Sequence, residues 1–379
     1  MQILDLSYWE KKELFEGLDY VIIGAGLVGL SAAYQLAIKS KKCKILIVEK
    51  EILPTGASSK NAGFTCFGSP SELISDLQTT SADIVWSTVK KRYDGIDFLK
   101  NWLGIENIKY QQLGSQDLVL PSSKVSPEEI KDNLETINRG YKEATGIDQV
   151  VVEDYDSMKH NGFRGFTSSF FNKIEGQIDT ASMYYSARRE IQKMENVQLL
   201  SGIDILSFDT NSNGVELSSN LGEFSTQKLL IASNGFSKLL MPQQDVLPAR
   251  AQVLVTEPIK DLKIKGTFHL DSGYYYFREI DQRILLGGGR NIDIKGETTT
   301  DFAITQNIQN KLDELLSNNI LPDQKVKIEY RWAGIMGVGE NKKPEIKKLN
   351  DRVSIAIRLG GMGVALGAAL GKELADLNG

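Results

Sequence analysis

The chain is poor in the residues that build disulfide frameworks and metal centres. It has two cysteines, Cys43 and Cys66, and two histidines, His160 and His269, in 379 residues. Two cysteines cannot form a disulfide framework, and they are typical of a protein in a reducing compartment. Two histidines exclude a histidine-rich metal site and leave little material for a histidine-based catalytic triad. We interpret His269, which stands in a strand-like run, as a packed or surface imidazole.

Charge of one sign and long apolar runs are lacking too. The 44 basic and 49 acidic residues give a net charge of −5, which argues against a nucleic-acid partner or an anionic membrane surface. No apolar run reaches the roughly eighteen residues that a membrane span needs, and the N-terminus does not have the apolar core of a signal peptide. We therefore expect a cytoplasmic protein. A chain of 379 residues exceeds the size of a single core, so we expect two domains.

What the sequence does contain is a complete mononucleotide-binding unit near its start. An apolar run at residues 20–23 leads into the glycine-rich turn GAGLVG at 24–29, and a helical pattern follows to about residue 39. A second apolar run at 45–48 ends on Glu49. The order of strand, turn, helix and strand predicts a βαβ unit with the turn at a helix N-terminus.

Each glycine of this turn has a mechanical role. Gly24 permits the tight turn, Gly26 lets the backbone approach a pyrophosphate, and Gly29 lets the helix contact the strand. The phosphates then lie where free N–H groups and the helix dipole favour negative charge. Glu49 stands twenty residues after Gly29, which is the place for a carboxylate on the adenosine ribose. We infer that the chain binds an adenine dinucleotide.

A second glycine-rich segment near the end of the chain bears on the choice of cofactor. Another apolar run at 353–357 is followed by GGMG at 360–363 and by a helical pattern to about residue 378. This is a second place where the backbone can approach a flat ligand. An NAD-binding domain needs one such place, whereas FAD is often enclosed by both ends of a chain. The pattern favours FAD and leaves an NAD-dependent dehydrogenase as an alternative.

The middle of the chain predicts a mixed architecture. Strand patterns at 197–200 and 228–231 extend the first unit, and residues 246–300 are rich in strands. A helix near 301–317 and a strand at 325–331 follow. The fold class is α/β (α+β overall), with a Rossmann-like FAD-binding domain and an interleaved antiparallel-sheet substrate domain. We assign residues 1–85, 146–245 and 320–379 to the discontinuous FAD-binding domain, and 86–145 and 246–319 to the substrate-binding domain.

Four segments together resemble the FAD-dependent amine and amino-acid oxidases of the D-amino-acid oxidase, glycine oxidase and sarcosine oxidase type. They are the mononucleotide unit, GASSKNAGF at 56–64, YYYFR at 274–278 with the following RILLGG, and GMGVAL at 361–366. Many flavoproteins share the first motif, but the whole set in this order is more specific. The runs SYW at 7–9 and WAG at 332–334 favour the branch similar to gamma-glutamylputrescine oxidoreductase.

The resemblance implies that both ends of the chain contact FAD. Some members attach the flavin through a cysteine just after the region of Gly334, where this chain reads IMGV, so we expect a non-covalent cofactor. We interpret Cys66 as an inert small hydrophobe. The helix after residue 363 suits the negative charge that a reduced flavin gathers. The implied cofactor-binding residues are Gly24, Gly26, Gly29, Glu49, Ser58, Ser59, Asn61, Ala62, Gly63, Ile205, Ser233, Asn234, Gly361, Met362, Gly363 and Val364.

The resemblance also indicates where a substrate binds. In members that oxidise amino acids, the arginine of a Gly-Leu-Arg-Pro motif holds the substrate carboxylate. Here the matching segment is GIMG at 334–337, and Met336 cannot pair with a carboxylate. This departure favours an amine substrate, or an acid held by another arginine.

Arg278 is the leading candidate for that other arginine. On an extended strand Tyr274, Tyr276 and Arg278 share one face, because side chains alternate. The alternative is that Arg278 pairs with Glu279, Asp281 or another acid outside the pocket. The candidate substrate-binding residues are therefore Tyr274, Tyr276, Arg278 and Met336.

The implied reaction is oxidation of a C–N bond in a small amine or amino acid. A neutral amine binds over the flavin, hydride passes from its carbon to flavin N5, and the imine is hydrolysed. The residues offer no convincing catalytic base, and we name none. Oxygen or another electron acceptor reoxidises the flavin; Leu285 stands where oxygen-activating members have a lysine, which favours a dehydrogenase. A non-catalytic flavin-binding subunit of a hetero-oligomeric dehydrogenase is an alternative, and the sequence does not give the oligomeric state.

Overall fold

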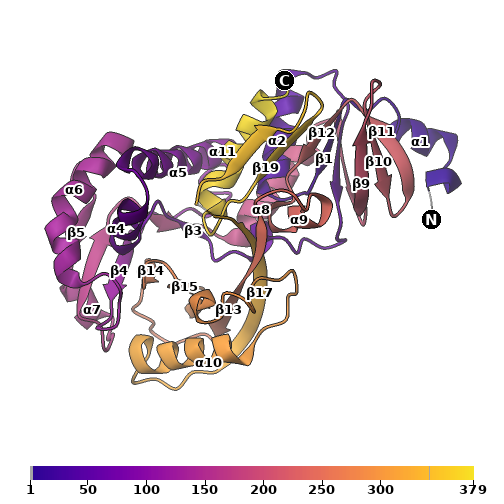
Figure 1. Cartoon of the computed structure of the whole chain (residues 1–379). Coiled ribbons are helices and arrows are strands. Elements are labelled where there is room, and N and C mark those ends of the chain that lie inside the picture. Colours follow the sequence, from indigo (N-terminus) through magenta and orange to yellow (C-terminus); the bar gives the residue numbers. More distant parts are fainter. Residues whose placement is uncertain (1–2, 341) are drawn as a thin grey trace.

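The computed structural model of the chain describes residues 3–340 and 342–379 (Figure 1). One of its two large sheets has six strands in the order β18-β19-β12-β1-β2-β8. Five of them run parallel, and β18 pairs antiparallel with β19 at one edge. The apolar runs of the sequence form the central strands because both faces of this sheet are covered. The strands are β1 (Tyr20–Ile23), β2 (Ile45–Glu49), β8 (Val197–Ser201), β12 (Lys228–Ile231), β18 (Glu345–Lys348) and β19 (Val353–Ile357).

Helices cover one face of this sheet and a small sheet lies beside its other face (Figure 1). Helix α2 (Leu27–Lys39) packs against α11 (Gly363–Asp376), so the first and last long helices of the Rossmann-like unit are neighbours. A Cβ added at Gly371 of α11 would lie 2.4 Å from the Val28 carbonyl oxygen, so the close approach requires glycine. Helix α8 (Thr180–Gln192) contacts α2. The small sheet consists of β9 (Ile205–Thr210), β10 (Val215–Ser219) and β11 (Gly222–Thr226), with η1 (Ile3–Asp5) and α1 (Tyr8–Leu14) near it.

The second large sheet has eight strands in the order β17-β13-β16-β15-β14-β4-β6-β5, and all its pairs are antiparallel except β14 with β4. One face packs on α10 (Gln306–Leu315) and the π-helical turn η4 (Leu316–Ile320) through an apolar core. The strands are β4 (Ser115–Val119), β5 (Val151–Glu153), β6 (Ser168–Asn172), β13 (Leu247–Thr256), β14 (Thr267–Leu270), β15 (Tyr275–Ile280), β16 (Arg283–Gly288) and β17 (Ile328–Val338).

Helices at one end of the molecule and short connecting elements complete the fold. Helix α6 begins where the sequence has Ser126-Pro127, and the Ser126 hydroxyl accepts a hydrogen bond from the Glu129 N–H at 3.1 Å. The two-stranded pair of β3 (Phe64–Thr65) and β7 (Gly176–Gln177) lies between the large sheets. The remaining elements are α3 (Ala57–Lys60), α4 (Pro70–Thr79), α5 (Ala82–Leu103), α6 (Pro127–Thr145), α7 (Asp156–His160), η2 (Asn234–Phe236), α9 (Ser237–Leu240) and η3 (Arg290–Ile292).

The fold class is the predicted one, and three expected boundaries were wrong. The strand expected at 325–331 begins at Ile328 and continues to Val338, because it pairs with β13 along nearly the whole of that strand. The helix expected near 301–317 begins at Gln306. Strand β15 begins at Tyr275, so Tyr274 lies just outside it.

The predicted division into two domains stays a prediction; β5, β6 and β17 belong to the eight-stranded sheet. Within the described ranges, no helix is long and apolar enough to cross a membrane.

Candidate functional site

The glycine-rich turn lies where the parallel strands β1, β2 and β12 end. Gly24 has a φ of +103°, which favours glycine, and a Cβ added there would lie 2.9 Å from the Ala232 carbonyl oxygen. A Cβ added at Gly29 would lie 2.0 Å from the carbonyl oxygen of Gly24. The turn therefore needs glycine at both positions. The tight turn places the start of α2 at the carboxyl edge of the strands, where doubly wound sheets bind ligands.

The N-terminus of α2 is joined by two of the predicted cofactor-binding residues. Its N-cap is Gly26, which supplies no side chain to cover the free N–H groups. The Ser58 hydroxyl accepts a hydrogen bond from the Leu27 N–H at 2.8 Å, and Glu49 Oε2 accepts one from the Ala25 N–H at 2.9 Å. Because of these bonds, Gly26, Glu49 and Ser58 converge on one helix N-terminus, where the helix dipole favours negative charge.

The loop at 58–63 is shaped by its own polar side chains. Asn61 Oδ1 accepts from the Gly63 N–H at 2.9 Å, while its amide donates to the carbonyl oxygens of Ala57 and Ser58. The Ser59 hydroxyl donates to the Pro54 carbonyl oxygen at 2.8 Å. Gly63 has a φ of +75° and lies against Ile178. In this structure the side chains of Ser59 and Asn61 therefore hold the loop.

The C-terminal glycine segment meets β3 and β17 at the same place. Met362 Sδ lies 3.6 Å from Cys66 Sγ, and a Cβ added at Gly361 would lie 3.9 Å from Met336 Sδ. A Cβ added at Gly363 would meet no heavy atom within 4 Å outside its own helix and chain neighbours in the described residues. Helix α11 therefore begins at open space, with Val364 in its first turn. Segments from both ends of the chain thus enclose one region.

Three further predicted cofactor-binding residues make separate contacts: Asn234, Ser233 and Ile205. Asn234 Oδ1 accepts from the N–H of Arg358 at 3.0 Å and so ties η2 to the segment that leads into the C-terminal glycines. The Ser233 and Ser237 hydroxyls lie 2.8 Å apart. Ile205 opens β9 with its side chain in the core, just after a segment in which the Ile203 N–H donates to the Glu49 carbonyl oxygen at 3.0 Å.

Burial decides the chemistry of Cys66. It raises the pKa of the Cys66 thiol well above its ordinary value, so the thiol stays protonated and unreactive. This agrees with its interpretation as an inert hydrophobe, although the structure places it beside the predicted flavin edge.

One face of the eight-stranded sheet closes the region from the other side. The register pairs Tyr276 with His269 and Arg278 with Thr267, so these four side chains share a face. On the same face, Val253, Val255 and Leu285 form a buried cluster with Ala62, and Phe64, Tyr276 and Trp332 pack against it. The indole N–H of Trp332 donates to the Lys60 carbonyl oxygen at 3.1 Å. The loop at 58–64 therefore packs directly on this face of the sheet, and the two together form one wall of the candidate site.

Arg278 is a buried cation on this face. Its side chain donates to the Gly63 carbonyl oxygen at 3.4 Å, its Nε is buried without a hydrogen-bond partner, and the residue is 3% exposed. In the described part of the chain, no carboxylate lies within 4.0 Å of it, and Glu279 pairs instead with Lys265 at 3.2 Å. Burial lowers the pKa of Arg278 to about 10. The alternative pairing with Glu279 or Asp281 is thus not formed.

The two candidate tyrosines differ in their placement. The ring of Tyr276 lies against Gly287, where an added Cβ would be 2.7 Å from the phenolic oxygen, and burial raises the pKa of Tyr276 to about 12. Tyr274 precedes the strand and is exposed. The structure therefore brings Tyr276, Arg278 and Met336 to the walls of the site and leaves Tyr274 at its margin.

Sequence reasoning did not consider Glu175, took His269 for a packed or surface imidazole, and used Phe64 only as the end of the segment at 56–64. The ring of Phe64 meets both His269, at 5.3 Å between centroids, and Tyr276, at 5.5 Å. His269 is packed, as expected, but beside the site, with Nε2 3.7 Å from Glu175 Oε2. The position of Phe64 directly after the GASSKNAG run was a usable signal. Nothing local in the sequence joins Glu175 to His269.

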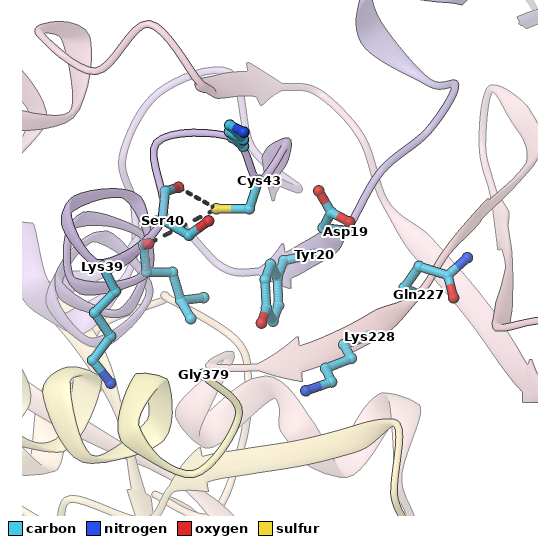
Figure 2. Close-up of a pocket in the computed structure, with 10 residues that line it drawn as sticks. Asp19, Tyr20, Lys39, Ser40, Cys43, Gln227, Lys228 and Gly379 are labelled. Carbon is cyan, nitrogen blue, oxygen red and sulfur yellow. Dashed lines mark hydrogen bonds between the residues drawn. The ribbon is translucent and has the colours of Figure 1, made fainter.

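A separate hollow of about 500 Å³ lies at the opposite end of the parallel strands (Figure 2). It includes Tyr20 and Lys228, the first residues of β1 and β12, with Cys43 donating to the Ser40 carbonyl oxygen at 2.9 Å. Ligands of doubly wound sheets bind at the carboxyl ends of the strands, so this hollow is not the predicted nucleotide site. No cluster of histidine, cysteine and carboxylate side chains suited to a metal was found in the described residues.

Comparison with known proteins agrees with this geometry. The probable oxidoreductase OrdL of Haemophilus influenzae is 22% identical over 95% of this chain and 83% of its own. L-Proline dehydrogenase of P. horikoshii has a TM-score of 0.76 at 18% identity, covering 96% of this chain and 94% of its own. Glycine oxidase of Geobacillus kaustophilus has a TM-score of 0.75 at 18% identity, covering 95% and 94%.

A third solved structure, iminodiacetate oxidase of a Chelativorans species, has a TM-score of 0.75 at 19% identity and covers 94% of each chain. At these identities the structural likeness shows the fold. The family match goes further, because it covers residues 19–377 and therefore both ends of the candidate site. It makes FAD the cofactor and argues against the NAD-dependent alternative. The chain belongs to the FAD-dependent oxidoreductase family.

Proposed function

We propose that this protein oxidises the C–N bond of a small amine or amino acid. The observation that carries the proposal is Arg278, a buried cation with no ion pair among the described residues, on the sheet face against which the loop at 58–64 packs. A guanidinium in such a place is suited to a carboxylate ligand. Three structural neighbours are L-proline dehydrogenase, glycine oxidase and iminodiacetate oxidase, and the name of each contains an amino acid with a carboxylate near its nitrogen.

The residues present fit FAD. Gly26 adds no side chain at the N-terminus of α2, where among the described residues the Ser58 hydroxyl accepts only the Leu27 N–H, and Gly363 leaves open space at the start of α11. Glu49 ends β2 and accepts a hydrogen bond from the Ala25 N–H of the glycine turn, which is the position proposed for a carboxylate on the adenosine ribose. We propose that the cofactor is held by the sixteen residues named from the sequence, and that Ser59 and Asn61 act by shaping the loop.

The protein's own contribution is to bind, orient and exclude water. When bound, FAD supplies the oxidant that accepts hydride at N5. Arg278 fixes the carboxylate and thereby aims the C–H bond, while Tyr276 stays a neutral phenol that can donate a hydrogen bond. Val253, Val255 and Leu285 make the neighbouring wall apolar. The imine product leaves and is hydrolysed by water.

The arginine proposed to bind the carboxylate lies on β15 and not on β17. Met336 on β17 presents a thioether near Gly361, so β17 provides no cation at that position. We propose that β15 holds the carboxylate through Arg278 instead. Leu285, which stands where oxygen-activating members of the family have a lysine, packs with Val253 and Val255, and this missing cation supports an electron acceptor other than oxygen.

Anaerobic reduction of the bound flavin tests the proposal. The purified holoprotein is mixed without oxygen with glycine, N-methylglycine, L-proline, iminodiacetate and dimethylamine, and the absorbance at about 450 nm, typical of flavins, is followed. Bleaching by at least one amine, with formation of the corresponding carbonyl compound, is expected. Bleaching by dithionite alone would instead indicate a flavin-binding subunit without turnover of its own.

A further inference from the structure

We propose that His269, oriented by Glu175, takes a proton from the amino group of the substrate before the carbon is oxidised. The inference rests on the proposed function and adds the acid–base group that the sequence did not reveal. Amines near neutral pH are mostly ammonium ions, and an ammonium has no lone pair with which to form a C=N bond. An acceptor for that proton beside the substrate therefore speeds the reaction.

The position of His269 follows from the strand register. It lies on β14 directly opposite Tyr276 of β15, and Arg278 is two residues further on the same face. The rings of His269 and Tyr276 both meet Phe64, at 5.3 and 5.5 Å between centroids. His269 therefore borders the same wall as the residue proposed to hold the carboxylate, one strand away from it.

Glu175 lies beside the imidazole in a fixed, buried position. Its carboxylate is completely buried and accepts hydrogen bonds from the N–H groups of Phe67 at 2.6 Å and Gly68 at 3.2 Å, and from the Ser115 hydroxyl. Its Oε2 lies 3.7 Å from His269 Nε2, a distance that can shorten when ligand closes the site. A carboxylate fixed in this way favours the tautomer that carries its proton on Nε2.

The other ring nitrogen is the one that can react. Nε2 is completely buried and has no hydrogen-bond partner within the described residues, so it needs the Glu175 carboxylate, while the side chain as a whole keeps 9% exposure. With Nε2 protonated toward Glu175, Nδ1 presents a lone pair on the side away from the carboxylate. This is the arrangement of an acceptor oriented by an acid, built on β14 and the segment before β7.

The charged groups around β14 favour an acceptor that works near neutral pH. Burial alone would lower the pKa of His269, but Glu175, Asp117 and Glu72 together raise it above its ordinary value. Asp117 comes from β4, and burial raises its own pKa. On the other side β15 contributes Tyr276, which stays neutral, and the Arg278 cation.

Glu72 is balanced by two cations of its own. It lies 3.6 Å from Arg92 and 3.1 Å from Lys342. These two cations compensate most of its negative charge and so weaken its effect on His269. Glu175 is therefore the closest carboxylate partner of the imidazole. Its removal should be the change that lowers the basicity of His269 most.

The proposed step balances as a simple proton transfer. One N–H bond of the substrate ammonium breaks, its electron pair stays on nitrogen, and the proton forms a bond to His269 Nδ1. The resulting imidazolium is balanced by Glu175. The nitrogen lone pair then forms the C=N bond as hydride leaves the carbon for FAD, and the imidazolium later releases its proton to solvent.

Nuclear magnetic resonance tests the geometry without turnover. The chain has only two histidines, so His160→Gln leaves a single imidazole, and His160 is exposed at the end of α7. In the ¹⁵N-labelled holoprotein, His269 should titrate above its ordinary pKa and carry its proton on Nε2 when neutral. Glu175→Gln should move that titration to lower pH. A neutral form protonated on Nδ1, or a titration unaffected by Glu175→Gln, would overturn the inference.

The pH dependence of flavin reduction tests the role. With the fastest amine of the panel above, His269→Gln should slow anaerobic reduction roughly 100-fold near pH 7. The deficit should shrink as the pH rises toward the pKa of the amine, because the substrate then loses its proton to solvent. Glu175→Gln should shift the acidic limb of the profile to lower pH, and His160→Gln should change nothing.

The outcomes separate the two proposals. A deficit of His269→Gln that is the same at every pH would mark a structural role and overturn this inference alone. If that variant does not fold, the shift of the acidic limb in Glu175→Gln decides. No bleaching of the wild-type flavin by any amine would overturn the proposed function, and this inference with it.

Discussion

At the scale of single residues, the burial of the Arg278 cation carries a free-energy cost that another interaction must offset. A buried cation without a carboxylate partner costs several kcal/mol, so a fold keeps one only where something offsets the cost. Its hydrogen bond to the Gly63 carbonyl oxygen is 3.4 Å long, and Nε has no partner. A substrate carboxylate would complete this site. The guanidinium keeps its positive charge near neutral pH, which suits that role.

Replacing Arg278 should separate substrates by their charge. We expect Arg278→Gln to raise KM for N-methylglycine and iminodiacetate roughly 10- to 100-fold, because a charge-assisted hydrogen bond is worth about 1.5–3 kcal/mol. KM for dimethylamine, which has no carboxylate, should change little. Steady-state kinetics with each amine makes the measurement, and the flavin spectrum should stay normal.

Arg164→Gln is the matched control for this change. Arg164 is an exposed guanidinium that pairs with Asp323 at 3.0 Å, so its loss should leave both kinds of substrate unaffected. An equal rise of KM for dimethylamine and the carboxylate-bearing amines in Arg278→Gln would show that the arginine only supports the loop at Gly63.

At the scale of elements, the contact of α2 with β1 depends on the absence of a side chain at Gly29. A Cβ there would lie 2.0 Å from the Gly24 carbonyl oxygen, so Gly29→Ala must move the helix away from the strand. We expect a loss of roughly 1–3 kcal/mol in the free energy of unfolding, as for other overpacked sites. Thermal unfolding of the FAD-free protein measures it without the contribution of bound cofactor.

Gly56→Ala provides the comparison for Gly29→Ala. Gly56 has a φ of −70°, and a Cβ added there has no heavy atom within 4 Å among those considered. Gly56 is the N-cap of the short helix α3, where alanine is less favourable than glycine, so its replacement should lower the unfolding temperature only slightly and far less than Gly29→Ala does. Equal effects of the two changes would contradict the argument from close approach.

Elements set by local pattern could be predicted from the sequence, and those set by distant partners could not. The run at 20–23, the glycine turn and the helix to Lys39 appear as expected, because propensity, turn chemistry and burial agree there. Strand β17 runs past its expected end because β13 pairs with it as far as Val338. Gly334 and Gly337 lie within this strand, where an added Cβ would come within 3.3 Å of Lys60 and within 2.4 Å of Asn234 respectively.

The same distinction applies to the candidate site. The motifs identified both glycine segments and Arg278, since each is a recognisable local run. His269 and Glu175 meet only because β14 and the segment before β7 converge in the fold. A period-two pattern gives the face of a side chain, but it does not name the carboxylate that packs behind it.

At the scale of the whole molecule, a charged cluster joins the helical region to the end of the Rossmann-like sheet. Glu72 of α4 lies 3.6 Å from Arg92 of α5 and 3.1 Å from Lys342, which precedes β18. Burial by itself would raise the pKa of Glu72, but the two cations outweigh it and lower the pKa from 4.5 to about 2. Asp76, also paired with Lys342 at 2.7 Å, has a raised pKa because burial and Glu72 disfavour its charge.

This cluster should make stability depend on acid pH. Because the pKa of Glu72 is lower in the folded protein, its stabilising contribution is fully present above pH 4.5 and is lost as the pH falls toward 2. Glu72→Gln should therefore lower the free energy of unfolding by on the order of 3 kcal/mol at pH 7, with a much smaller difference near pH 3. Urea denaturation of the holoprotein across this range gives the comparison. Glu314→Gln, which removes an exposed partner of Lys311, should cost at most about 1 kcal/mol. A Glu72→Gln deficit of constant size from pH 7 to pH 3 would show that packing, rather than the ionised carboxylate, joins these elements.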